Sequence, residues 1–146
     1  MGIEGSLGRR FPKIGNHKYV GESLDEQIAN QREYVLSELD EARSEMMKCD
    51  WSAMAVEVMD TIHAAETLFD LLEKSGVSLE EAKANAKNPH WVARGYNMLL
   101  CVHFMRLVRM CDEWLEMLGR SGVDLGCSHE YVIEKNARRA YYDLVE

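Results

Sequence analysis

The chain has 146 residues, of which 47% are hydrophobic, and carries a formal net charge of −8. This length and composition suit one domain with its own core and exclude a wholly disordered chain. The acidic balance argues against nucleic acid as a partner, and no apolar run approaches the roughly 20 residues of a membrane span. The N-terminus has no signal-peptide core and the four cysteines have no regular spacing, so we expect a reduced, cytoplasmic protein.

Helix signals begin after residues 1–22, a stretch rich in glycine and basic residues that we expect to form an irregular arm. Ser23 and Glu26 have the spacing of a capping box, in which each side chain bonds the other residue's backbone N–H. The sequence therefore predicts that the first helix starts here and extends to about Cys49.

The later helices are expected from caps, glycines and proline, and their spans are about Trp51 to Ser75, Leu79 to Ala86, Pro89 to Leu118 and Glu130 to Leu144. We expect Asp50 to cap the second of the five helices and Ser128 to cap the last. No segment shows sustained strand alternation. The sequence thus predicts an all-α fold, an antiparallel helical bundle of about five helices in a single domain over residues 1–146.

A partial internal repeat links two of the expected helices. Residues 57–79 align without gaps on residues 103–125, and SGVSL falls on SGVDL at the end of the two copies. Chance is the alternative, because any two amphipathic helices align to some degree. If the repeat is genuine, its second copy has lost two acids, because His103 and Arg106 stand where the first copy has Glu57 and Asp60.

Two acidic pairs face each other across the expected turn between the first two helices. Glu38 and Glu41 share one shoulder of the first helix, because residues three apart are neighbours on a helix. Glu57 and Asp60 head a strip of the second helix that continues through apolar residues and is therefore expected to be buried. A short connection makes the two helices antiparallel partners, so the pairs should lie nearly level.

Four facing carboxylates without a counter-charge would repel one another, and burying each would cost several kcal/mol. Mg²⁺ prefers carboxylate and water oxygens and would relieve this cost, with Mn²⁺ as a substitute. The spacing therefore predicts a metal site formed by Glu38, Glu41, Glu57 and Asp60. The alternative is a solvated acidic patch, because glutamates three residues apart are common on exposed helices.

These motifs resemble those of the MazG-like nucleoside triphosphate pyrophosphohydrolases, an all-α superfamily that includes the dimeric dUTPases and the phosphoribosyl-ATP pyrophosphatases. ELDE and EVMD, at residues 38–41 and 57–60, are similar to the ExxE and ExxD motifs, and VIEKNARRAYY at residues 132–142 is similar to a KNxxRGYY ending. Two features depart from the pattern. Ala140 replaces the usual glycine, and residues 83–127 form an insert that contains the second copy of the repeat.

The resemblance implies Mg²⁺-dependent hydrolysis of a nucleoside triphosphate to the monophosphate and pyrophosphate, a housekeeping activity on the nucleotide pool. Glu41, with Glu38 beside it, would orient or deprotonate the attacking water. The KNxxR match assigns Lys135, Asn136 and Arg139 to the phosphates. Tyr142 would stack on the base, with simple packing as the alternative.

Two other functions stay open. One is a dUTPase-like or dCTPase-like enzyme with narrow base selection, which shares the metal chemistry. The other is a non-catalytic helical module for binding or assembly. The expected partners are the nucleoside triphosphate and further copies of the chain, as a dimer or a dimer of dimers, with no nucleic acid and no membrane.

Overall fold

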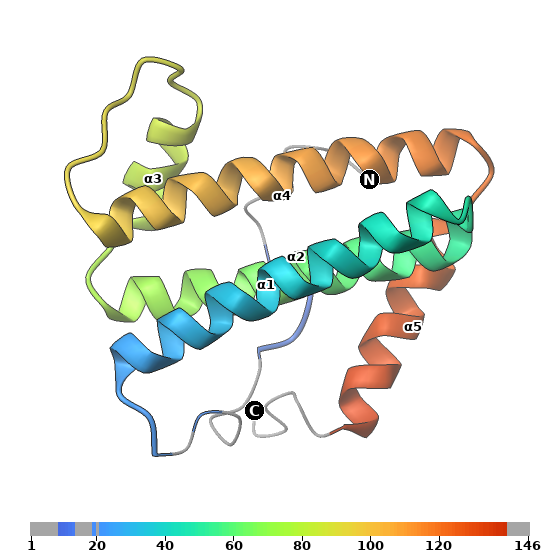
Figure 1. Cartoon of the computed structure of the whole chain (residues 1–146), viewed down its shortest axis with the longest axis horizontal. Helices are drawn as coiled ribbons and strands as arrows, with labels where there is room; N and C mark the ends of the chain where they lie inside the picture. The colour runs from blue at the N-terminus through green and yellow to red at the C-terminus, as the bar shows by residue number, and fades with distance from the viewer. Residues whose placement is uncertain (1–8, 14–18, 20, 140–146) are drawn as a thin grey trace.

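A computed structural model describes residues 9–13, 19 and 21–139, and within this part of the chain the fold is all-helical with no strand. The helices are α1 (Leu24–Met47), α2 (Trp51–Lys74), α3 (Leu79–Ala86), α4 (Tyr96–Arg120) and α5 (Leu125–Arg138). Figure 1 shows α1, α2 and α4 running side by side along the molecule, with α5 directed away from their shared end. The predicted bundle of about five helices is confirmed.

The first two helices form a hairpin that follows the predicted signals. Ser23 accepts a hydrogen bond from the backbone of Glu26, whose side chain accepts one from the backbone of Ser23, so the capping box is present. The turn after α1 places Cys49 at a φ of 59°, which reverses the chain within three residues, Lys48 to Asp50. The Asp50 side chain then accepts from the backbone N–H of Ala53 and starts α2.

The second helix is the centre of the molecule. It packs against α1, α4 and α5, and its side chains are buried almost continuously from Met54 to Leu72. This burial includes positions that the helical pattern assigns to a polar side, among them His63 at 4% exposure and Thr67 at 7%. The buried polar side chains of α2 therefore lose water on folding and need partners inside the protein.

The repeat is matched by two turns of the same geometry. Gly76 and Gly122, which follow the helix in each copy, have φ angles of 107° and 102°, and this left-handed conformation favours glycine. The next helix starts three residues after the glycine in both copies, capped by Ser78 in one and by Asp124 in the other. The prediction that Ser128 caps the last helix was therefore wrong, because Asp124 accepts from the backbone of Cys127 and α5 begins at Leu125.

The predicted start of the fourth helix at Pro89 was also wrong. Residues 87–95 form a loop, and α4 begins at Tyr96 after Gly95. The side chain of Arg106 explains why the loop persists, because it donates hydrogen bonds to the backbone carbonyls of Asn85, Ala86 and Asn88. These bonds satisfy carbonyl groups at the end of α3 that a continued helix would have used. In the described part of the chain, no helix is long and apolar enough to cross a bilayer.

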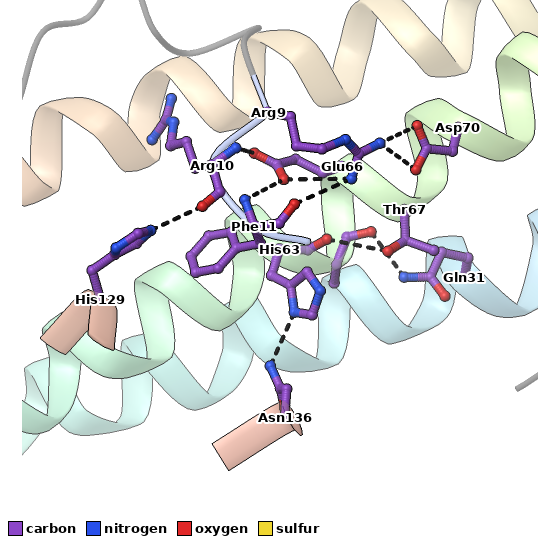
Figure 2. Close-up of polar contacts among 11 residues, drawn as sticks. Arg9, Arg10, Phe11, Gln31, His63, Glu66, Thr67, Asp70, His129 and Asn136 are labelled. Carbon is purple, nitrogen blue, oxygen red and sulfur yellow. Dashed lines mark hydrogen bonds and ion pairs between the residues drawn. The ribbon is translucent and has the colours of Figure 1, made fainter. Parts of the chain in front are cut away.

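The arm predicted over residues 1–22 contributes a segment to the core. Phe11 is only 2% exposed and lies between the rings of His63 on α2 and His129 on α5, with centroids at 5.1 and 4.9 Å. Backbone N–H groups of Arg10 and Phe11 donate to the Glu66 carboxylate at 2.8 and 3.2 Å. Figure 2 shows these bonds beside the helix.

Two arginines of the same segment hold neighbouring helices. The Arg9 guanidinium pairs with both carboxylate oxygens of Asp70 on α2. The guanidinium of Arg10 donates to Asp112 on α4 at 2.7 Å, and its backbone carbonyl meets the His129 ring at 2.9 Å. Residues 9–13 therefore tie α2, α4 and α5 together, a role that their sequence pattern did not indicate.

We predict that Phe11→Ala lowers the free energy of unfolding by about 3 kcal/mol, because the fully buried ring leaves a cavity between three helices. Urea unfolding followed by circular dichroism measures this change. Lys13→Ala, an exposed residue in the same segment, is the control and should stay within about 0.5 kcal/mol of wild type. Equal unfolding free energies for both variants would show that the segment does not anchor the bundle.

Candidate metal centre

Three of the four predicted metal ligands meet in one cluster. Glu38 and Glu41 come from successive turns of α1, and Glu57 comes from the facing turn of α2. One carboxylate oxygen from each lies within 4.8 Å of the others. The antiparallel packing of the hairpin produces this meeting, as the spacing of the motifs from the turn predicts.

The fourth predicted ligand, Asp60, has a different partner. It is 7% exposed, and its Oδ2 atom receives the Nζ ammonium of Lys135 at 2.6 Å. Its negative charge still acts on the cluster, because it raises the pKa values of both Glu38 and Glu57. The four predicted ligands are thus arranged as a trio of glutamates with a lysine-paired aspartate at its edge.

The cluster holds its negative charge with difficulty. Burial, followed by the charges of Asp60 and Glu41, raises the pKa of Glu38 to about 7. The same causes raise the pKa of Glu57 to about 7. The pKa of Asp60 is also raised, by burial, although Lys135 opposes the shift. Within the described residues, nothing donates a hydrogen bond to the buried Oε1 atom of Glu57.

These features fit a divalent cation. The donor set consists of carboxylate oxygens alone, which suits hard ions such as Mg²⁺ and Mn²⁺ and does not suit ions that prefer nitrogen or sulfur. A bound cation would supply the positive charge that the raised pKa values of Glu38 and Glu57 show to be missing. It would also give the Oε1 atom of Glu57 a partner. Glu41 is the most exposed of the three and faces the solvent side of the cluster.

The predicted phosphate-binding residues take separate positions. Lys135 lies at the cluster edge, between Asp60 and the ring of Tyr131, with its Nζ atom 5.9 Å from the ring centroid. Arg139 is exposed at the end of α5, and its charge lowers the pKa of Asp60, so it lies within electrostatic reach of the same edge. Tyr142 lies outside the described residues.

Asn136 differs from these residues because it is buried. It is 3% exposed, and its Nδ2 atom lies 3.0 Å from Nδ1 of His63 in the core, as Figure 2 shows. This contact docks α5 on α2, and the role of Asn136 in phosphate binding stays a prediction. Sequence reasoning missed this pair because His63 falls on the side of α2 that the helical pattern assigns to solvent. Comparison of the chain with family models, curated proteins and solved structures finds no match.

We predict that the metal-free protein loses stability as the pH rises from about 4.5 to 7. Glu38 and Glu57 have folded-state pKa values raised to about 7, so the folded state binds more protons than the unfolded state across this window. Once solvent screening is allowed for, each group should contribute about 1 kcal/mol. Urea unfolding at pH 5 and pH 8 with a chelator present measures the loss.

The pKa of Glu66 is also raised, so this residue makes the protein less stable over the same pH range. The double variant Glu38→Gln, Glu57→Gln separates the contribution of the cluster to the pH dependence of stability from that of Glu66. The variant should be more stable than wild type at pH 8 and about equal to it at pH 5. A wild-type protein that is equally stable at both pH values would contradict the prediction.

Proposed function

We propose that this chain is a Mg²⁺-dependent nucleoside triphosphate pyrophosphohydrolase of the MazG-like type. The observation that carries the proposal is the meeting of three glutamate oxygens within 4.8 Å on a helical hairpin. The raised pKa values of Glu38 and Glu57 and the lysine at the cluster edge support the same function. All three glutamates of the cluster belong to the two motifs, Glu38 and Glu41 to ELDE and Glu57 to EVMD.

In this proposal Glu38, Glu41 and Glu57 hold the cation, which when bound would neutralise phosphate oxygens and acidify a water molecule. Lys135 and Arg139 attract the triphosphate to the edge of the cluster and lower the repulsion between its charge and the carboxylates. Asp60 keeps the Lys135 ammonium at that edge through the 2.6 Å bond.

Glu41 is the residue that we assign to the attacking water, because it is both part of the cluster and exposed to solvent. Its carboxylate orients the water and accepts one proton as the oxygen bonds to phosphorus. The bond between the α- and β-phosphates breaks, and pyrophosphate leaves beside Lys135. Glu38 lies one turn before Glu41 and would hold the cation. No covalent intermediate is required.

The proposal includes self-association, in line with the expected dimer or dimer of dimers. Several large apolar side chains are exposed on the surface, among them Met47 at 79%, Met117 at 56% and Trp51 at 44%. Burial of such side chains between copies would stabilise an oligomer.

We predict that the wild-type protein releases pyrophosphate from nucleoside triphosphates only when Mg²⁺ is present. Glu57→Gln should lower kcat/KM by at least about 100-fold, because the cluster then loses a ligand. Glu113→Gln, an exposed glutamate on α4, is the matched control and should keep wild-type kcat/KM. A coupled pyrophosphate assay with ribo- and deoxyribonucleotides measures this. No release from any triphosphate would contradict the enzyme and favour a binding or assembly module.

We predict separately that Mg²⁺ binding stabilises the fold. At about ten times its dissociation constant, an ion that binds only the folded state raises the free energy of unfolding by about 1.4 kcal/mol. Urea unfolding with and without Mg²⁺, at equal ionic strength, measures the gain. Glu57→Gln should lose most of it and Glu113→Gln should keep it, whereas an equal gain in all three proteins would place the ion elsewhere.

A further inference from the structure

A cavity of about 510 Å³ lies beside the candidate metal centre. Its walls come from the first turns of α2, the turn between α4 and α5, and the first turns of α5, and the lining residues include Ser52, Ala53, Val56, Glu57, Val123 and Asp124. Cys127, Ser128 and Tyr131 line the α5 side. The volume lies in the range of about 300–1,000 Å³ that is typical of small-molecule sites.

The cavity and the carboxylate cluster are adjacent. Glu57 belongs to both, because it lines the cavity and also gives an oxygen to the cluster. Tyr131 lines the cavity on α5, and its ring lies under the ammonium of Lys135, one helical turn further along. Lys135 in turn bonds Asp60. A molecule in the cavity therefore lies about one helical turn, or about 5 Å along the helices, from the proposed phosphate position.

The charge of the walls determines which part of a nucleotide fits. Among the described residues, the lining contains two carboxylates, Glu57 and Asp124, and no lysine or arginine. Such walls repel phosphate groups but accept the uncharged nucleoside, which is apolar on its faces and polar at its edges. The basic groups that attract phosphate, Lys135 and Arg139, lie on the other side of Tyr131. The triphosphate would thus extend out of the cavity toward the cluster.

Asp124 supplies a means of base selection. One of its oxygens, Oδ1, accepts the backbone N–H of Cys127 at 3.0 Å as the cap of α5, which holds the carboxylate in place. A carboxylate accepts several hydrogen bonds and donates none, so it retains capacity for a further donor. Cytosine, adenine and guanine each carry an exocyclic amino group, whereas uracil and thymine carry none and have a carbonyl oxygen where cytosine has its amino group.

We propose that this cavity binds the nucleoside of the substrate, and that Asp124 selects bases that carry an exocyclic amino group. The proposal rests on the proposed function for the identity of the ligand. It disfavours a dUTPase-like activity and favours nucleotides of cytosine, adenine and guanine over those of uracil and thymine. Nothing in the sequence motifs indicated the cavity, because its walls come from three segments that meet only in the folded chain.

The two exposed cysteines provide the test. Cys127 lines the cavity, whereas Cys49 lies in the turn between α1 and α2, and the other two cysteines are buried. We would measure the rate of iodoacetamide modification at each exposed cysteine by peptide mass spectrometry, with and without cytidine or uridine. Cytidine has an amino group where uridine has a carbonyl oxygen, and the adjacent ring nitrogen bears a hydrogen only in uridine. Neither nucleoside carries phosphate, so the test needs neither metal nor catalysis.

At a cytidine concentration of about twice its dissociation constant, modification of Cys127 should slow about threefold, because two thirds of the cavities are then occupied. Cys49 should react at an unchanged rate, and uridine should protect Cys127 much less than cytidine. Asp124→Asn should reverse the preference, because the amide can donate to the uracil carbonyl. Asparagine is also a good N-cap, so α5 should be retained, which circular dichroism checks.

A filled cavity is the second test. Ala53→Trp should remove the protection by cytidine, and Ala84→Trp, at an exposed position on α3, should keep it. No protection of Cys127 in the wild type, or equal slowing of Cys49, would overturn the nucleoside site. Equal protection by uridine would overturn the selection by Asp124. Pyrophosphate release with an unprotected Cys127 would refute this inference alone, and protection without pyrophosphate release from any triphosphate would refute the proposed function alone.

Discussion

Burial of the central helix is the constraint on which the rest of the structure depends. Because α2 is covered on most sides, each of its buried polar groups must find a partner within the protein. Glu66 receives backbone N–H groups from residues 9–13, His63 meets Asn136, and Asp60 meets Lys135. These partners come from the first and last described segments of the chain, so the polar groups of α2 also direct how the ends of the fold close over it.

Glu57 differs from these residues because its Oε1 atom has no hydrogen-bond partner among the described residues. It faces two further glutamates, and its pKa is raised because burial and like charges both disfavour ionisation. A cluster of this kind lowers the stability of the fold when no cation is bound to it. The proposed cation and the triphosphate give this cost a function, because both bring charges that the cluster and its lysine edge can bind.

The helix of the second half that aligns with α2 has a different role. In α4 the positions that align with Glu57 and Asp60 hold His103, which is exposed, and Arg106, which fixes the loop after α3. This helix supports α2 and leads through its glycine turn into α5. Residues 83–127 thus lead the chain to α5, which brings Lys135 to the carboxylates. The last residues of this range also form part of the cavity beside them.

The sequence by itself determined the features that depend on near neighbours in the chain. The caps at Ser23 and Asp50, the glycine stop at Gly76 and the meeting of the glutamates across a short turn all follow from local spacing. The helix starts predicted at Pro89 and Ser128 were wrong because Gly95 and Asp124, close by in the sequence, precede the helices instead. The repeat already indicated the cap of α5, since Asp124 aligns with Ser78.

Only the tertiary structure decided which polar groups are paired. The Asp60–Lys135 bond, the Asn136–His63 contact and the insertion of Phe11 join residues that lie far apart in the chain. No helical periodicity encodes such contacts, because periodicity tells which face of a helix is apolar and not which segment will cover the polar one. The cavity could not be predicted from the sequence for the same reason, because its walls form only when α5 packs against α2.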